Sequence, residues 1–199
     1  MENKNDRPLV SFIVTTYNLP TTLLCECLQS ILSLSLSKEE REIIVVDDGS
    51  EVSPLNDLVE LRDKIVYVRQ RNKGLSEARN MGLVCAQGKF IQFVDGDDYL
   101  IQAPYEHCLD IARYKDADII LFHETEEEQP EVPFECNGPM TGSAYMHQYN
   151  LRASACGYLF RANILGNLRF TPNLLHEDEE FTPQLNPTPN PVTITFIPE

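Results

Sequence analysis

A regular alternation of strand and helix signals from Leu9 to Phe122 constrains the fold of this chain more than any other feature. Short runs rich in β-branched and aromatic residues predict buried strands at 9–14, 42–46, 65–68, 90–94 and 119–122. Apolar residues at helical spacing predict helices at 21–32, 75–86 and 105–114, and a short one at 55–61. This alternation predicts an α/β fold with a mostly parallel central sheet and helices on both faces.

Polar side chains follow three of the predicted strands directly, at 15–18, 47–50 and 95–98. In open α/β sheets, ligands bind beyond the carboxyl ends of the strands. We therefore expect these segments to meet at one edge of the sheet, although the sequence does not give the strand order.

The strand and helix pattern weakens after residue 123. An acidic stretch from Glu124 to Glu135 is typical of a solvated loop, and Ala153 to Leu168 has the apolar spacing of either a helix or a buried strand. The prolines in 186–191 argue against regular structure there. We expect one domain over 1–185, with halves at 1–123 and 124–185, and a proline-rich tail over 186–199.

Charge and cysteine content restrict the class of protein. The net charge of -15 argues against a nucleic-acid partner, but it allows a small anionic ligand if a metal or local basic residues offset the negative charge. No apolar run reaches the roughly 20 residues of a membrane span, and the polar N-terminus is unlike a signal peptide, so a cytoplasmic protein is expected. The six cysteines form no CxxC pair, which favours free, buried thiols.

Asp95-Gly96-Asp97 presents two carboxylates at the end of a predicted buried strand. Mg²⁺ and Mn²⁺ are commonly held by one or two carboxylates and substrate phosphates, so a metal-diphosphate site is one interpretation. A turn that caps the next helix is the other, and Asp98 is expected to have only that capping role. An EF-hand is excluded because Leu100 stands where that loop needs glycine.

Three further groups each have a functional and a purely structural interpretation. Arg79, in the segment 72–80 at a predicted helix start, suits a phosphate or a surface ion pair. For Tyr17 and Asp48, the functional interpretation is contact with a nucleobase, and the structural one is a core position for Tyr17 and a turn for Asp48. The acidic run 176–180 suits a general base or a solvated face.

The order of these segments resembles family 2 glycosyltransferases of the GT-A, Rossmann-like fold. The resemblance is carried by 10–18, 45–50, 72–80, 93–99 and 176–179, and it runs from the first strand to about Leu185.

The resemblance implies roles for single residues. In the donor site, it implies that Thr15, Tyr17 and Asp48 hold the nucleobase and that Arg79 faces the diphosphate. Asn18 is implied as a further donor-binding residue beside them. Asp97 is implied as the direct ligand of Mn²⁺ or Mg²⁺, with Asp95 near the ribose and the metal. Asp178, with Glu177 beside it, is implied as the catalytic base.

The implied reaction moves a sugar from a nucleotide diphosphate sugar, with a UDP-sugar favoured, to a glycan or lipid-linked acceptor. It proceeds with inversion, as part of cell-surface polysaccharide synthesis, and peripheral membrane contact is compatible with it. Family members usually continue with helices after the acidic motif, so a shortened acceptor side is expected here. A phosphatase or nucleotidyltransferase on a similar scaffold, or a non-catalytic nucleotide-binding remnant, stays open as an alternative.

Overall fold

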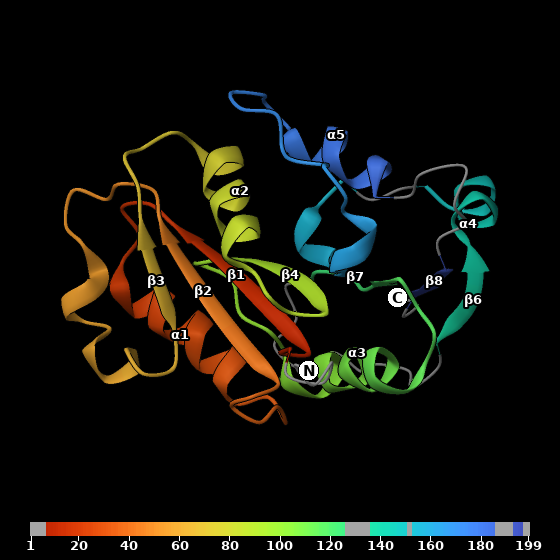
Figure 1. Cartoon of the computed structure of the whole chain (residues 1–199), viewed down its shortest axis with the longest axis horizontal. Coiled ribbons are helices and arrows are strands. Elements are labelled where there is room, and N and C mark those ends of the chain that lie inside the picture. Colours follow the sequence, from red (N-terminus) through yellow and green to blue (C-terminus); the bar gives the residue numbers. More distant parts are fainter. Residues whose placement is uncertain (1–6, 126–135, 151–152, 186–192, 197–199) are drawn as a thin grey trace, which may run out of the picture.

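The computed structural model describes residues 7–125, 136–150, 153–185 and 193–196 (Figure 1). Its strands are β1 (Val10–Thr16), β2 (Arg41–Asp47), β3 (Val66–Arg69), β4 (Phe90–Asp95), β5 (Ile119–Leu121), β6 (Asn137–Thr141), β7 (Tyr158–Arg161) and β8 (Thr193–Phe196). Its α-helices are α1 (Thr21–Leu32), α2 (Leu75–Cys85), α3 (Gln102–Tyr114), α4 (Gly142–Gln148) and α5 (Glu177–Gln184).

The described strands form one sheet in the order β3-β2-β1-β4-β7-β5-β8-β6. The first four positions are parallel throughout. Strand β7 runs antiparallel to both β4 and β5, while β8 is parallel to β5 and antiparallel to β6. The predicted α/β fold with a mostly parallel sheet is thus confirmed, and its antiparallel pairs all involve strands from the C-terminal part.

Helices cover both faces of the sheet, as predicted. Along β1, Phe12 and Val14 pack into one core cluster with α1 and α3, whereas Ile13 points into another with α2 and α5. Figure 1 shows α1 and α3 on one side of the sheet and α2 and α5 on the other. Burial on both faces explains why the strand sequences are continuously apolar.

Two segments differ from the sequence prediction, and in a third, 153–168, the structure has the buried-strand alternative. Residues 55–61 form two 3-10 turns, Pro54–Asn56 and Val59–Leu61, in place of one short helix. The ambiguous stretch 153–168 contains strand β7 between 3-10 turns at Ala155–Gly157 and Ala162–Ile164.

The second difference is β8, which lies within the expected tail. Its pairing with β5 and β6 joins segments that are far apart in the sequence, and a local sequence pattern does not predict such a pairing. The acidic stretch 126–135 and the proline segment 186–192 lie outside the described residues.

The structure also gives the state of the cysteines and the length of the helices, which the sequence analysis considered. All six cysteines are free; Cys27 and Cys108 are buried, and the others are half-buried. Among the described residues, no helix is long and apolar enough to span a membrane.

Candidate active site

The carboxyl ends of β2, β1 and β4 meet at the point where the strand order reverses. The chain moves from β1 outward through β2 to β3 and then returns to β4 on the other side of β1. In register, Thr15 of β1 lies beside Asp95 of β4, and Thr16 lies beside Asp47 of β2. The expected convergence is confirmed, and such switch points are where ligands bind in this class of fold.

Gly96 allows the turn after β4 to lie close against β1. A Cβ atom at this position would stand 2.7 Å from the backbone oxygen of Thr15, so any other residue would push the two strand ends apart. The Thr15 hydroxyl donates to Asp95 Oδ1 at 3.4 Å. Asp95 is therefore held against β1, while Asp97 is exposed to solvent on the far side of the glycine.

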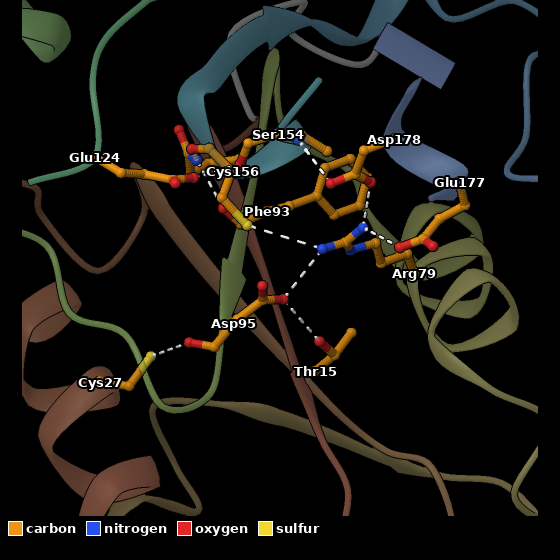
Figure 2. A network of polar contacts seen from close by, with 12 residues as sticks. Thr15, Cys27, Arg79, Phe93, Asp95, Glu124, Ser154, Cys156, Glu177 and Asp178 are labelled. Carbon is orange, nitrogen blue, oxygen red and sulfur yellow. Dashed lines mark hydrogen bonds and ion pairs between the residues drawn. The ribbon is translucent and has the colours of Figure 1, made fainter. Parts of the chain in front are cut away.

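Arg79 of α2 connects this strand end to helix α5. Its side chain is only 2% exposed, and its guanidinium donates to Asp95 Oδ1 at 3.2 Å and to Glu177 Oε1 at 3.0 Å. A third ion pair joins it to Asp178 Oδ1 at 2.5 Å. Figure 2 shows the guanidinium between the β4 carboxylate and the two carboxylates of α5.

The electrostatics of this cluster follow from burial and charge. Burial alone would lower the pKa of Arg79, but the surrounding carboxylates and Cys156 outweigh it, and the pKa is raised. Burial raises the pKa of Asp178, although Arg79 and the Ala155 N–H oppose the rise. Three carboxylates against one guanidinium leave an excess of two negative charges, which favours a cation nearby.

These residues fit a divalent metal that is shared with a ligand. Within the described ranges, no group of three or more His, Cys, Asp or Glu side chains could by itself hold a metal ion. Mg²⁺ and Mn²⁺ sites completed by substrate phosphates need only one or two carboxylates. Asp97 is exposed and Asp95 is 36% exposed, so both have oxygen atoms within reach of such an ion.

Asp98 does not cap the following helix, contrary to the sequence prediction. Helix α3 begins at Gln102, its N-cap is Ile101, and no side chain caps it. The pKa of Asp98 is raised by burial and by its neighbours Asp95 and Asp97. Its position therefore adds to the negative potential beside the strand end.

The residues expected to hold a nucleobase differ in accessibility. Tyr17, just past β1, is 51% exposed and presents its ring to solvent. Asn18 has a left-handed backbone (φ 50°) and ties the two loops together, because its N–H donates to Ser50 Oγ and its side chain accepts from the Glu51 N–H.

Asp48 is buried, and its carboxylate is hydrogen-bonded to the loop before α2. Its Oδ1 accepts from Gln70 Nε2 and the Lys73 N–H, and its Oδ2 accepts from the Gly74 N–H. Direct recognition of a base by Asp48, as expected from the resemblance, would have to compete with these bonds. The arrangement shows Asp48 as the residue that fixes the start of α2.

Asp47, at the end of β2, is also unavailable, which weakens the phosphatase alternative, since such an enzyme could use an aspartate at a strand end as its nucleophile. The side chain is fully buried, its Oδ1 accepts from the Ser50 N–H, and its Oδ2 accepts from the Tyr67 hydroxyl. A nucleophilic carboxylate needs an oxygen that can reach a substrate.

The structure places Arg79 differently from its expected role at the diphosphate. The side chain is buried, and both terminal nitrogens donate to carboxylates. The sequence reasoning missed this because the partners in α5 are 98 and 99 residues away. It also gave no role to Asn80 or Phe170, which contact each other beside this cluster.

The comparisons with known proteins agree on one family. The family described as Glycosyl transferase family 2 matches residues 11–149. An uncharacterized glycosyltransferase of Bacillus subtilis, EpsJ, is 36% identical over 134 residues, which cover 63% of this chain and 38% of that protein. The minor teichoic acid biosynthesis protein GgaB of the same organism is 27% identical over 173 residues, covering 82% of this chain and 19% of GgaB.

A solved structure matches the fold over nearly the whole chain. The crystal structure of S. aureus TarS 1-349 in complex with UDP superimposes with a TM-score of 0.77 at 25% identity, covering 94% of this chain and 57% of that one. The matches therefore span well under two thirds of each of these relatives.

Proposed function

Because the chain belongs to glycosyl transferase family 2, we propose that it transfers a sugar from a UDP-sugar to a glycan or lipid-linked acceptor, with inversion at the anomeric carbon. The observation that carries this proposal is the ion-pair cluster in which Arg79 joins Asp95, at the end of β4, to Asp178 of α5. It unites a donor-side carboxylate with a carboxylate suited to accept a proton. The relation to GgaB and to UDP-bound TarS supports a polysaccharide pathway and a uridine nucleotide.

The donor would lie across the carboxyl ends of β1 and β4. The exposed ring of Tyr17 is placed to stack on the base, and Thr15 and Asn18 line the same strand end. Asp48 acts here through the loop 70–74, which it fixes in place. Asp97, supported by Asp95, would hold Mn²⁺ or Mg²⁺, whose charge offsets the charge that develops on the departing diphosphate.

Asp178 is the proposed base. The acceptor oxygen forms a bond to the anomeric carbon, the bond from that carbon to the diphosphate breaks, and its electron pair leaves with UDP. The hydroxyl proton passes to Asp178, whose side chain is 20% exposed. Each of its oxygens already accepts one bond, from Arg79 or the Ala155 N–H, and keeps a second lone pair for the proton.

Thermal melting and turnover test the two parts of this proposal separately. UDP with Mn²⁺ at 100 times its dissociation constant should raise the free energy of unfolding by about 2.7 kcal/mol. A panel of labelled UDP-, GDP- and dTDP-sugars then tests transfer or donor cleavage. UDP stabilisation without turnover of any sugar would favour a non-catalytic nucleotide-binding protein, and hydrolysis of simple phosphate esters would favour a phosphatase.

A further inference from the structure

Asn80, the residue after Arg79 in α2, makes a two-point contact with the backbone of a distant segment. Its side-chain amide donates to the Phe170 carbonyl at 2.8 Å and accepts from the Phe170 N–H at 2.9 Å. The two residues are 90 positions apart in the sequence. Because both backbone groups of Phe170 are satisfied by one side chain, this contact fixes the position and the orientation of the segment before α5.

The ring of Phe170 connects the backbone that Asn80 holds to helix α5. Phe170 is 1% exposed and stacks on Phe181 of α5, with ring centroids 3.8 Å apart and an interplanar angle of 10°. Both rings also form T-shaped pairs with Phe93 in β4, and the ring centroids lie 5.3 Å (Phe170) and 6.1 Å (Phe181) from that of Phe93. The position of α5 over the sheet is thus tied to the backbone that Asn80 holds.

Arg79 contacts the N-terminal turn of the same helix. It pairs with Glu177 and Asp178 in the first turn of α5, and its guanidinium carbon lies 5.3 Å from the centre of the Phe170 ring. Two consecutive residues of α2 therefore hold the C-terminal segment at two points, the first turn of α5 and the backbone of Phe170.

Helix α5 has little in its own sequence to fix it. It is 8 residues long, contains Pro183, and starts after His176 in a left-handed conformation without a side-chain cap. Helices this short are marginal in water and depend on tertiary contacts for their position. The bonds from α2, together with the Ala155 N–H, therefore determine where the Asp178 carboxylate lies.

We propose that Asn80 is a positioning residue for the proton-accepting carboxylate: by holding Phe170, it sets the place of α5 and hence of Asp178 relative to Asp95. The inference rests on the proposed function, since it assigns Asn80 to the step in which Asp178 takes the acceptor proton. The Asn80 side chain bonds to the Phe170 backbone and, within the described part of the chain, not to the carboxylates, so its effect on the reaction is indirect.

The test compares Asn80→Ala with the wild type in kcat and in UDP affinity. A displacement of about 1 Å in reacting groups can cost 10²-fold, so kcat should fall roughly 10- to 100-fold. The dissociation constant for UDP with Mn²⁺ should stay within about twofold, because the donor side is held by β1 and β4. Asn163→Ala, at an exposed position of a 3-10 turn, is the matched control and should leave both values unchanged.

Two further variants separate positioning from general loss of structure. Asn80→Asp keeps the size and the acceptor for the Phe170 N–H, but it cannot donate to the Phe170 carbonyl, so kcat should fall here too. In an Asp178→Asn background, Asn80→Ala should cause no further loss, because residues that act through one another are not additive.

The inference is overturned if Asn80→Asp and Asn80→Ala keep kcat within about twofold of the wild type. It is equally overturned if UDP affinity falls as much as kcat, or if the loss from Asn80→Ala is the same with and without Asp178. Failure of the proposed function itself looks different: Asp178→Asn alone would then retain the wild-type rate.

Discussion

The two regions that meet at the candidate site are built in different ways. The parallel half, β1 to β4 with α1 and α2, has 7-residue central strands β1 and β2, paired along their whole length. The C-terminal segment, residues 153–185, has a 4-residue strand and an 8-residue helix, and side chains from α2 attach it. The strands of the parallel half are therefore fixed by extensive pairing, whereas the carboxylates of α5 depend on a few tertiary contacts for their position.

The largest stability effect is expected at the phenylalanine stack that attaches the C-terminal segment. Phe170→Ala should lower the free energy of unfolding by roughly 3–5 kcal/mol, because it leaves a cavity beside Phe93 and Phe181. Urea denaturation measures the loss, and hydrogen exchange should show amides of 168–185 opening before those of β1. Leu175→Ala, at a side chain that is highly exposed, should stay within about 0.5 kcal/mol.

If the amides of β1 and of 168–185 lost protection equally in Phe170→Ala, the segment and the sheet would unfold as one unit. That result would contradict the difference drawn between the two regions.

Arg79→Met should cost about 3 kcal/mol, at the lower end for breaking a buried ion pair, because the carboxylates keep some solvent. The pKa of Asp178 is already raised by burial, and removal of Arg79 takes away the charge that opposes the rise. A raised carboxyl pKa makes folding stability fall as pH increases above the unfolded value, about 3.9. The free energy of unfolding of the variant should therefore fall more steeply with pH than that of the wild type.

Arg113→Met provides the matched control for Arg79. Its ion pair with Glu40 is partly exposed, so its removal should cost no more than about 1 kcal/mol. If the free energy of unfolding changed with pH in the same way for Arg79→Met and the wild type, Arg79 would not be the group that opposes the rise in the Asp178 pKa.

Asp97→Ala should remove the metal-dependent part of nucleotide binding and leave the fold intact, because this side chain is exposed. The stabilisation of about 2.7 kcal/mol expected from UDP with Mn²⁺ at 100 times its dissociation constant should largely disappear. Melting with UDP, with and without Mn²⁺, is the measurement, and Asp63→Ala at an exposed position is the control. An unchanged Mn²⁺ requirement would remove Asp97 from the metal site.

Gly82→Ala tests whether α2 supports both regions through its contact with β1. A Cβ at this position would lie 2.2 Å from Ile13 Cγ2, so the helix or the strand must shift. Overpacking of this kind costs roughly 1–3 kcal/mol, and the better helix propensity of alanine returns up to about 1 kcal/mol. A net loss of about 1–2 kcal/mol is expected. The loss should be smaller in an Ile13→Ala background, where the Cγ2 atom that clashes is absent. A net gain would mean that the contact is loose.

The sequence was informative where structure is set locally and uninformative where it is set by distant partners. The apolar runs of β1, β2 and β4 and the periodicity of α1 and α2 predicted these elements closely. The antiparallel direction of β7 and the insertion of β8 could not be predicted, because strand pairing depends on segments far away in the chain.

The same division applies to the candidate site. Asp95 and Asp97 were predicted as site residues from their place at a strand end, and Asp178 from the resemblance; their chemical roles stay predictions. The burial of Arg79 among carboxylates of α5 was not predicted, nor was the use of Asp48 on the loop before α2. Nothing in the sequence around Phe170 indicated that Asn80 would hold its backbone.

The central claim is that donor binding belongs to the parallel half and proton acceptance belongs to the C-terminal segment. The most direct test is to measure kcat and UDP affinity together for Asp178→Asn, which keeps the size of the side chain but removes its ability to take a proton. The account predicts that kcat falls by roughly 10²–10⁴, while the dissociation constant for UDP with Mn²⁺ is unchanged. An unchanged kcat, or a loss of UDP binding as large as the loss of rate, would contradict it.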